Sequence, residues 1–349
     1  MSGADGAPVL IPVLANHRFD EAALARYLAT NLPDFAGPIT VRQFQGGQSN
    51  PTFVVDTAHD RYVLRKQPPG HLLPSAHAVD REFRVMRALA GSAVPVPEML
   101  LLCTDPGVIG TIFFVMRHVE GRVFVDRTLP AQSPEGRGAL YAEMGRVLAD
   151  LHAVNWRAAG LEGFGRPEGY VRRQVDRWAR QYRASDVGDV PAMDSLIAWL
   201  AAHVPADDES AIAHGDFRLG NLIYAAHSPR VAAVLDWELS TIGHPIADLA
   251  YSCLYWRLPP DLGGLRELDI PGLPSEREFV VEYRRRTGRA SLPDFEFFVA
   301  FSLFRWAAIA AGVYRRALDG NAADAAGLQA GEKFQALAAI GWDVARRAA

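Results

Sequence analysis

Three oxygen-bearing side chains stand close together in the second half of the sequence. Asp216 comes five residues before Asn221, and Asp236 follows the next apolar run. The residues on either side of Pro229 predict two short strands joined by a turn. In an antiparallel hairpin the start of the first strand lies beside the end of the second, so Asn221 and Asp236 should converge. Carboxylate and amide oxygens of this kind suit Mg²⁺.

An Asp, an Asn and a second Asp in this order are typical of a phosphoryl-transfer site. In such a site the first Asp orients the attacking hydroxyl or accepts its proton, and the other two hold the metal that neutralises phosphate charge. We therefore expect Asp216, Asn221 and Asp236 to gather around a divalent cation in a crevice between two lobes that admits a nucleotide.

The motifs around these residues are more specific than the single residues. His214-Gly215-Asp216, Asn221 and Leu235-Asp236-Trp237-Glu238 together closely resemble the aminoglycoside phosphotransferase and choline kinase superfamily, from about residue 40 to the last helices. Members of that superfamily are small-molecule kinases with a protein-kinase-like fold. A narrower resemblance is to kinase-like domains that stand alone in bacteria or are fused to acyl-CoA dehydrogenases in animals. It is carried by residues 64–70, 73–77 and 80–83.

The resemblance implies a role for each matching residue of the second half. Asp216 corresponds to the catalytic aspartate, His214 to the residue that supports its loop, and Asn221 and Asp236 to the Mg²⁺ ligands.

Two further carboxylates follow. Asp248 matches a family aspartate at the start of a helix, which implies that it braces the catalytic loop through backbone hydrogen bonds. Glu238 is either a metal or substrate carboxylate or a solvated charge at the end of a strand.

The resemblance also implies a nucleotide site in the first third of the chain. There the family places a basic side chain on the third strand against the phosphates of ATP, paired with a helix carboxylate. Strand alternation sends Arg65 and Lys66 to opposite faces, so only one can point into the site, and we favour Arg65 with Glu82 as its partner. The other candidates lie in the glycine turn and in the hinge between the lobes at residues 116–119, and they are Gly47, Ser49, Asn50, Met116, Arg117 and Val119.

The elements that must position these residues change in character near residue 120. The pattern before it predicts strands and one main helix, begun by Ser75, whereas the pattern after it predicts mostly helices. The predicted fold is α+β and protein-kinase-like, with a small antiparallel β N-lobe and a larger helical C-lobe. We divide the chain into a helical extension, a nucleotide-binding N-lobe and a C-lobe with the catalytic loop and acceptor site, at residues 1–34, 35–118 and 119–349.

Composition restricts the class of partner. The 349 residues carry 36 Lys plus Arg against 40 Asp plus Glu, a formal net charge of −4, so the chain lacks the charge of a nucleic-acid-binding protein. Its two cysteines cannot form a disulfide framework and favour a reducing compartment. The apolar stretch 295–314 contains Glu296 and Arg305, which favours a buried helix over a membrane span. We expect a cytoplasmic protein with a small-molecule partner, and the pattern does not indicate an oligomeric state.

Three alternatives stay open. A metallohydrolase would use His214, Asp216, His244 and Asp236 as ligands, although the Asn and Asp set fits Mg²⁺ better. A protein kinase would need a longer docking segment than the twelve positions from Asp236 to Asp248. A non-catalytic nucleotide-binding module is supported only by an arginine at the place of the usual lysine.

The predicted function is ATP- and Mg²⁺-dependent phosphate transfer to a hydroxyl of a small molecule. From residue 251 to the end, 13 basic residues stand against 12 acidic ones, a net charge of +1. That balance provides no acidic surface for a polycation and favours a neutral or anionic acceptor. The narrower resemblance points the same way, to a hydroxyacyl-CoA or related metabolite. An aminoglycoside or other antibiotic kinase is the alternative.

Overall fold

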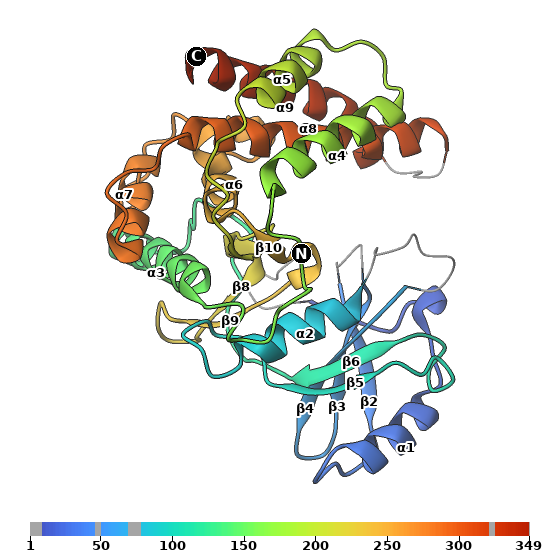
Figure 1. Ribbon diagram of the computed structural model, residues 1–349. Helices are drawn as coiled ribbons and strands as arrows, with labels where there is room; N and C mark the ends of the chain where they lie inside the picture. Colours follow the sequence, from blue (N-terminus) through green and yellow to red (C-terminus); the bar gives the residue numbers. More distant parts are fainter. Residues whose placement is uncertain (1–8, 46–49, 69–77, 321–324, 349) are drawn as a thin grey trace. The chain divides into compact units, whose positions relative to one another are not determined.

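The computed structural model describes residues 9–45, 50–68, 78–320 and 325–348 (Figure 1). Their internal contacts divide the chain into two compact units, each built from separate stretches of sequence. We call the first the sheet unit, which comprises Met1–Gln132, Arg157–Leu161 and Arg218–Ser240. The second is the helical unit, which comprises Ser133–Trp156, Glu162–Phe217 and Thr241–Ala349. The functional segments 1–34, 35–118 and 119–349 are a different division and stay a prediction.

A six-stranded antiparallel sheet forms most of the sheet unit. Its strand order is β1-β2-β3-β4-β6-β5. The strands are β1 (Leu10–Ile11), β2 (Thr40–Phe44), β3 (Thr52–Asp56), β4 (Arg61–Lys66), β5 (Met99–Cys103) and β6 (Phe113–Arg117). The sequence pattern predicts all of them except β1, whose two residues are too short to show an alternation.

Two helices cover opposite faces of this sheet, as Figure 1 shows. Helix α1 (Glu21–Asn31) begins after Asp20, whose side chain accepts a hydrogen bond from the amide of Ala23, as expected of an N-cap. Its Leu24 and Leu28 are fully buried in one cluster with Leu64 of β4. Because side chains alternate along a strand, the neighbours of Leu64 on β4 face the other side of the sheet, where α2 lies.

Helix α2 (Val79–Leu89) begins later than the sequence indicates. Its N-cap is Ala78, which forms no side-chain cap bond, and Ser75 lies outside the described residues. The apolar positions of α2 are buried, and the ring of Phe83 lies 6.2 Å from that of Phe114 on β6. Packing of the apolar stripe against the sheet therefore fixes this helix, together with the acidic first turn that Asp80 and Glu82 supply.

The predicted hairpin of the second half of the chain is confirmed. Strands β8 (Leu222–Tyr224) and β9 (Val231–Val234) pair antiparallel, with Leu222 opposite Val234. The hairpin belongs to the sheet unit, because Arg122 and Tyr224 exchange two backbone hydrogen bonds of 2.7 and 2.8 Å. Gly121 is needed beside this bridge, since a Cβ there would lie 2.2 Å from the carbonyl oxygen of Tyr224.

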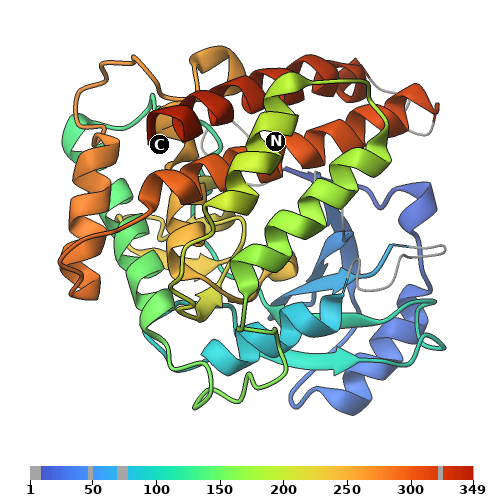
Figure 2. The same cartoon turned by 45° about the horizontal axis from the view of Figure 1, so that its top comes forward.

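The helical unit is built on seven helices with one small strand pair, β7 (Ala211–Ala213) and β10 (Thr241–Gly243). Helices α8 and α9 run side by side along most of their length (Figure 2). The helices are α3 (Pro134–Ala153), α4 (Tyr170–Ser185), α5 (Pro191–Ala202), α6 (Pro245–Arg257), α7 (Glu276–Thr287), α8 (Phe295–Leu318) and α9 (Ala325–Ala348).

Helix α8 is both long and apolar. Its length and composition would allow it to cross a membrane, but 72% of its most apolar window is buried inside the structure. Phe298, Phe301 and Phe304 are among its fully buried side chains. It therefore has the surroundings of a core helix, as the sequence indicates.

We expect Gly121→Ala to destabilise the protein by about 2 kcal/mol or more, because the added methyl group would overlap backbone that a strand pair holds in place. Gly138→Ala in α3 is the matched control. Its Cβ would make only one contact, at 3.4 Å, and alanine favours a helix by up to about 1 kcal/mol. Chemical denaturation of both variants checks this, and equal stabilities would contradict it.

Candidate functional site

A cavity of about 310 Å³ lies within the sheet unit. Ligand pockets commonly have volumes of ~300–1,000 Å³. One part of its lining is apolar and comprises Val63, Met86, Pro97, Phe114, Met116, Val119, Val123, Ile223 and Leu235. The polar part is formed by Thr52, Arg65, Glu82, Asn221 and Asp236, among others. An apolar slot that ends in charged groups matches the two ends of a nucleotide, a flat base and a polyphosphate.

Arg65 is the centre of the polar part. Its Nε lies 3.0 Å from Oε2 of Glu82, and its Nη2 lies 2.9 Å from Oδ1 of Asp236. Nη1 donates a hydrogen bond of 3.2 Å to Oγ1 of Thr52, and Glu238 is 3.8 Å away. One guanidinium thus holds a strand, a helix and the end of the β8–β9 hairpin.

The charges of this cluster do not cancel. One guanidinium faces the three carboxylates of Glu82, Asp236 and Glu238, so the ionised cluster has a net charge of 1 − 3 = −2. Burial by itself lowers the pKa of Arg65, but these carboxylates outweigh it and raise the pKa, so Arg65 stays charged. Burial raises the pKa of Glu82 to about 7 against the attraction of Arg65, and the charges of Asp236 and Glu238 act in the same direction as burial.

Of the two basic candidates on β4, the structure places Arg65 in the cavity. Lys66 lies on the opposite face, the side of Leu64, where it is 2% exposed and burial lowers its pKa. Asn50 does not line the cavity. It is buried, and its Nδ2 donates a hydrogen bond of 2.8 Å to Oε1 of Glu82. The other two candidates of the glycine turn, Gly47 and Ser49, lie outside the described residues.

The hairpin brings Asn221 and Asp236 to one side of the cavity. The amide of Leu235 donates to the carbonyl oxygen of Asn221 at 2.8 Å, which continues the strand pairing by one step. Asp236 follows with φ of 65° and ψ of 59°, in the left-handed region that non-glycine residues rarely occupy. Backbone strain of this kind is often found at functional sites. Buried Trp237 anchors the turn, because its Nε1 donates to the carbonyl oxygen of Val234.

The chain that leaves β6 borders the apolar part of the cavity. The amide of Arg117 donates to the carbonyl oxygen of Glu98, and the amide of His118 donates to that of Arg61. Both amides are therefore already bonded to neighbouring segments of the sheet. The amide of Val119 forms no backbone hydrogen bond within the described part of the chain. Among the candidate residues of this hinge, Val119 therefore has the amide best suited to a ligand.

Asp216 and His214 belong to the helical unit, in the loop after β7. Asp248 of α6 is buried beneath this loop and accepts hydrogen bonds from the amides of His214 and Gly215 at 2.7 and 2.8 Å. Burial alone would raise the pKa of Asp248, but its bonds to His152 and to the loop amides outweigh burial and lower it. This bracing corresponds to the role the sequence indicates for Asp248.

Of the ligand set of a metallohydrolase, His214, Asp216 and His244 belong to the helical unit and Asp236 to the sheet unit. Within the described ranges no three His, Cys, Asp or Glu side chains converge as a metal site. His244 instead caps α6, since its Nδ1 accepts a hydrogen bond from the amide of Ile246, and its ring stacks on Phe298 at 4.5 Å. The expected gathering of Asp216 with Asn221 and Asp236 joins residues of the two units and stays a prediction.

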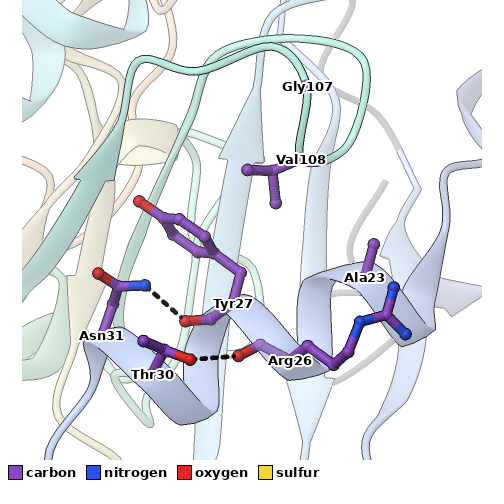
Figure 3. Close-up of a pocket in the computed structure, with 7 residues that line it drawn as sticks. All are labelled: Ala23, Arg26, Tyr27, Thr30, Asn31, Gly107 and Val108. Atoms are coloured by element: carbon purple, nitrogen blue, oxygen red, sulfur yellow. Dashed lines mark hydrogen bonds between the residues drawn. The ribbon is translucent and has the colours of Figure 1, made fainter.

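A second hollow, of about 320 Å³, lies between α1 and the segment after β5 that contains Gly107 and Val108 (Figure 3). Two of its polar side chains form hydrogen bonds to carbonyl oxygens of the same helix. Thr30 donates to the carbonyl oxygen of Arg26, and Asn31 donates to that of Tyr27. It lacks the converging charges of the first cavity, which is therefore the candidate ligand site.

Comparison with known proteins agrees with this geometry. Residues 40–296 match the model of the phosphotransferase enzyme family. The chain belongs to this family. It is 46% identical over 347 residues to chicken (Gallus gallus) acyl-CoA dehydrogenase family member 11, and the match covers 96% of this chain but only 44% of that protein. The chain thus spans less than half the length of this relative.

Solved structures show the same fold. A Ralstonia eutropha protein provisionally named an aminoglycoside phosphotransferase is 45% identical, with a TM-score of 0.88 and coverage of 95% of this chain and 99% of that one. A thermostable mutant of the aminoglycoside phosphotransferase APH(4)-Ia, in ternary complex with AMP-PNP and hygromycin B, is 20% identical. Its TM-score is 0.60, with coverage of 92% and 98%. The predicted superfamily and its kinase-like α+β fold are confirmed.

Sequence reasoning missed several contacts of this phosphotransferase. Tyr251 donates a hydrogen bond to Asp216, and Arg305 donates to the carbonyl oxygen of Gly215. His152 lies between Asp248 and the hydroxyl of Tyr283. These residues come from separate helices, and a single sequence carries no signal that pairs them.

The raised pKa of Glu82 predicts a pH effect on stability. Native protein keeps a proton on Glu82 up to about pH 7, whereas the ordinary value is 4.5. The contribution of this group to the free energy of unfolding is therefore complete below pH 4.5 and is lost as the pH rises through 7. Between pH 5 and 7.5, wild-type phosphotransferase should lose about 2 kcal/mol more than Glu82→Gln. Urea titrations at both pH values test this, and equal losses in the two proteins would refute it.

Proposed function

We propose that this phosphotransferase transfers the γ-phosphate of ATP to a hydroxyl of a small molecule with the help of Mg²⁺. The observation that carries the proposal is the cavity of the sheet unit, in which an apolar slot ends at Arg65, Asn221 and Asp236. The AMP-PNP and hygromycin B bound by the APH(4)-Ia mutant support a nucleotide and a small acceptor as the two substrates.

The two parts of the cavity suit different parts of ATP. Val63, Met116 and Leu235 would cover the faces of the adenine, and the amide of Val119 would donate to its edge. Arg65 would bind phosphate oxygens through its guanidinium, because Glu82 holds it from the helix side and leaves its position defined.

The residues present fit a magnesium ion. The polar part offers the amide oxygen of Asn221 and the carboxylate of Asp236, which are the hard oxygen donors that Mg²⁺ prefers. When bound, the ion would neutralise phosphate charge. Glu238, 3.8 Å from Arg65, contributes negative charge to the same cluster.

Asp216 would act on the acceptor. Its carboxylate would orient the attacking hydroxyl and accept its proton as the hydroxyl oxygen bonds to the γ-phosphorus. The bond from the γ-phosphorus to the β,γ-bridging oxygen would break in the same transfer, and ADP would leave. Asp248 would hold the loop in place through the amides of His214 and Gly215, while Nδ1 of His214 accepts a hydrogen bond from the amide of Asp216.

We propose a hydroxyacyl-CoA or related metabolite as the acceptor, because similar chains form part of acyl-CoA dehydrogenase family members. Local ion pairs account for many of the basic residues that follow position 251. Arg285 and Arg286 pair with Glu282, and Arg315 pairs with Asp319. Because these arginines pair with neighbouring carboxylates, the net charge of that region is not evidence for the charge of the acceptor. The acceptor proposal therefore rests on the similarity to these relatives.

Asp216→Asn should lower turnover about 10²- to 10⁴-fold, since the amide cannot accept the proton, and should change ATP affinity less than about twofold. The test is ADP release with Mg·ATP and a panel of hydroxyacyl-CoAs, sugars, amino alcohols and aminoglycosides. Wild-type protein that turns over none of them would refute the kinase function. Normal turnover of the variant would refute the role of Asp216.

Asp236→Asn should weaken Mg·ADP binding about tenfold or more, because the metal loses a carboxylate ligand. The binding of ADP in EDTA should change much less, because Glu82 still holds Arg65. Asparagine tolerates the left-handed backbone of this position. Asp56→Asn, which alters a carboxylate of β3 that pairs with Arg42 and Arg61 outside the cavity, is the matched control. Calorimetry with and without Mg²⁺ measures both, and an equal loss under the two conditions would argue against metal binding by Asp236.

A further inference from the structure

The geometry points to Tyr251 of α6 as a positioning residue that sets the orientation of the Asp216 carboxylate toward the acceptor hydroxyl. Its hydroxyl donates a hydrogen bond of 2.7 Å to Oδ1 of Asp216. Both residues belong to the helical unit. The inference rests on the proposed function, in which Asp216 accepts the proton of the acceptor.

A carboxylate on a loop can rotate about its Cβ–Cγ bond, and this torsion is broad. A hydrogen bond to one oxygen restricts the rotation and determines the direction in which the other oxygen points. With Oδ1 held by Tyr251, the plane of the carboxylate has a defined orientation toward the acceptor. Proton acceptance then has one starting geometry, which is the condition for efficient attack.

Tyr251 is itself held firmly. Arg305 of α8 lies over the ring of Tyr251, with its guanidinium carbon 5.7 Å from the ring centroid, and over Trp178 of α4 at the same distance. The same guanidinium donates a hydrogen bond of 3.2 Å to the carbonyl oxygen of Gly215. Arg305 thus connects the loop to the tyrosine that orients its carboxylate.

The charge state of Tyr251 agrees with a donor role. Burial, together with the charge of Asp216 beside it, raises the pKa of Tyr251 well above 10, so its hydroxyl keeps its proton and donates. The groups that face it are Asp216 on the loop, Arg305 on α8 and Tyr255 one turn further along α6.

Positioning and support of the fold predict different results. Asp248 already braces the backbone of the loop through two amide bonds, so removal of the Tyr251 hydroxyl should leave the loop in place. The loss should then be confined to the orientation of one carboxylate, and it should be seen in kcat rather than in substrate binding.

The experiment is Tyr251→Phe, which removes the hydroxyl and keeps the ring under Arg305. With Mg·ATP and the acceptor that wild-type protein turns over best in the panel above, kcat should fall about tenfold to a hundredfold. KM for ATP should stay within about twofold, and the thermal midpoint should stay near that of wild type. Tyr182→Phe, which alters a buried tyrosine of α4, is the matched control and should keep wild-type kcat.

A double-mutant cycle tests whether Tyr251 acts through Asp216. In the Asp216→Asn background, Tyr251→Phe should change the residual rate, followed with radiolabelled ATP, less than about twofold. A wild-type kcat in the single Tyr251→Phe variant would overturn the inference. So would a double variant whose rate is lowered by the product of the two single effects. Either result would leave the proposed function intact. Wild-type protein that phosphorylates no acceptor would overturn both.

Discussion

A buried guanidinium must be paired, and this requirement organises the sheet unit. Arg65 is 13% exposed in its side chain, and burial of its charge would be costly without the carboxylates of Glu82 and Asp236. Its contacts bind together β4, α2 and the β8–β9 hairpin, which are far apart in the sequence. The same contacts place the carboxylate of Asp236, which we propose as a metal ligand, beside the guanidinium that we propose for phosphate.

The helical unit contains a buried anion, Asp248, whose charge must likewise be compensated. Asp248 is fully inside the protein, and two backbone amides with one histidine surround its oxygens. Because these amides belong to the loop of Asp216, the free energy that keeps Asp248 satisfied also fixes the loop. In both units a charge that would be costly to bury alone is used to hold a residue on which the proposed chemistry depends.

The sequence determined much of the fold because helices, strands and hairpins leave local patterns. The cap at Asp20, the stripe of α2 and the β8–β9 hairpin can each be recognised within a short window. The motif from His214 to Glu238 indicated the family for the same reason, since its members are a few residues apart. The short strands β1, β7 and β10 were not predicted, because two or three residues are too few to show a periodic pattern of apolar side chains.

Local patterns showed that Arg65 and Lys66 face opposite sides of a strand, but only tertiary structure showed which side bears the cavity. Asn50 was expected to offer its amide to phosphate, and packing turned it toward Glu82 instead. Tyr251 and Arg305 meet the loop of Asp216 from two different helices. Contacts of this kind depend on how helices pack over distances of 35 to 90 positions in the chain, and no periodicity in a single sequence encodes that.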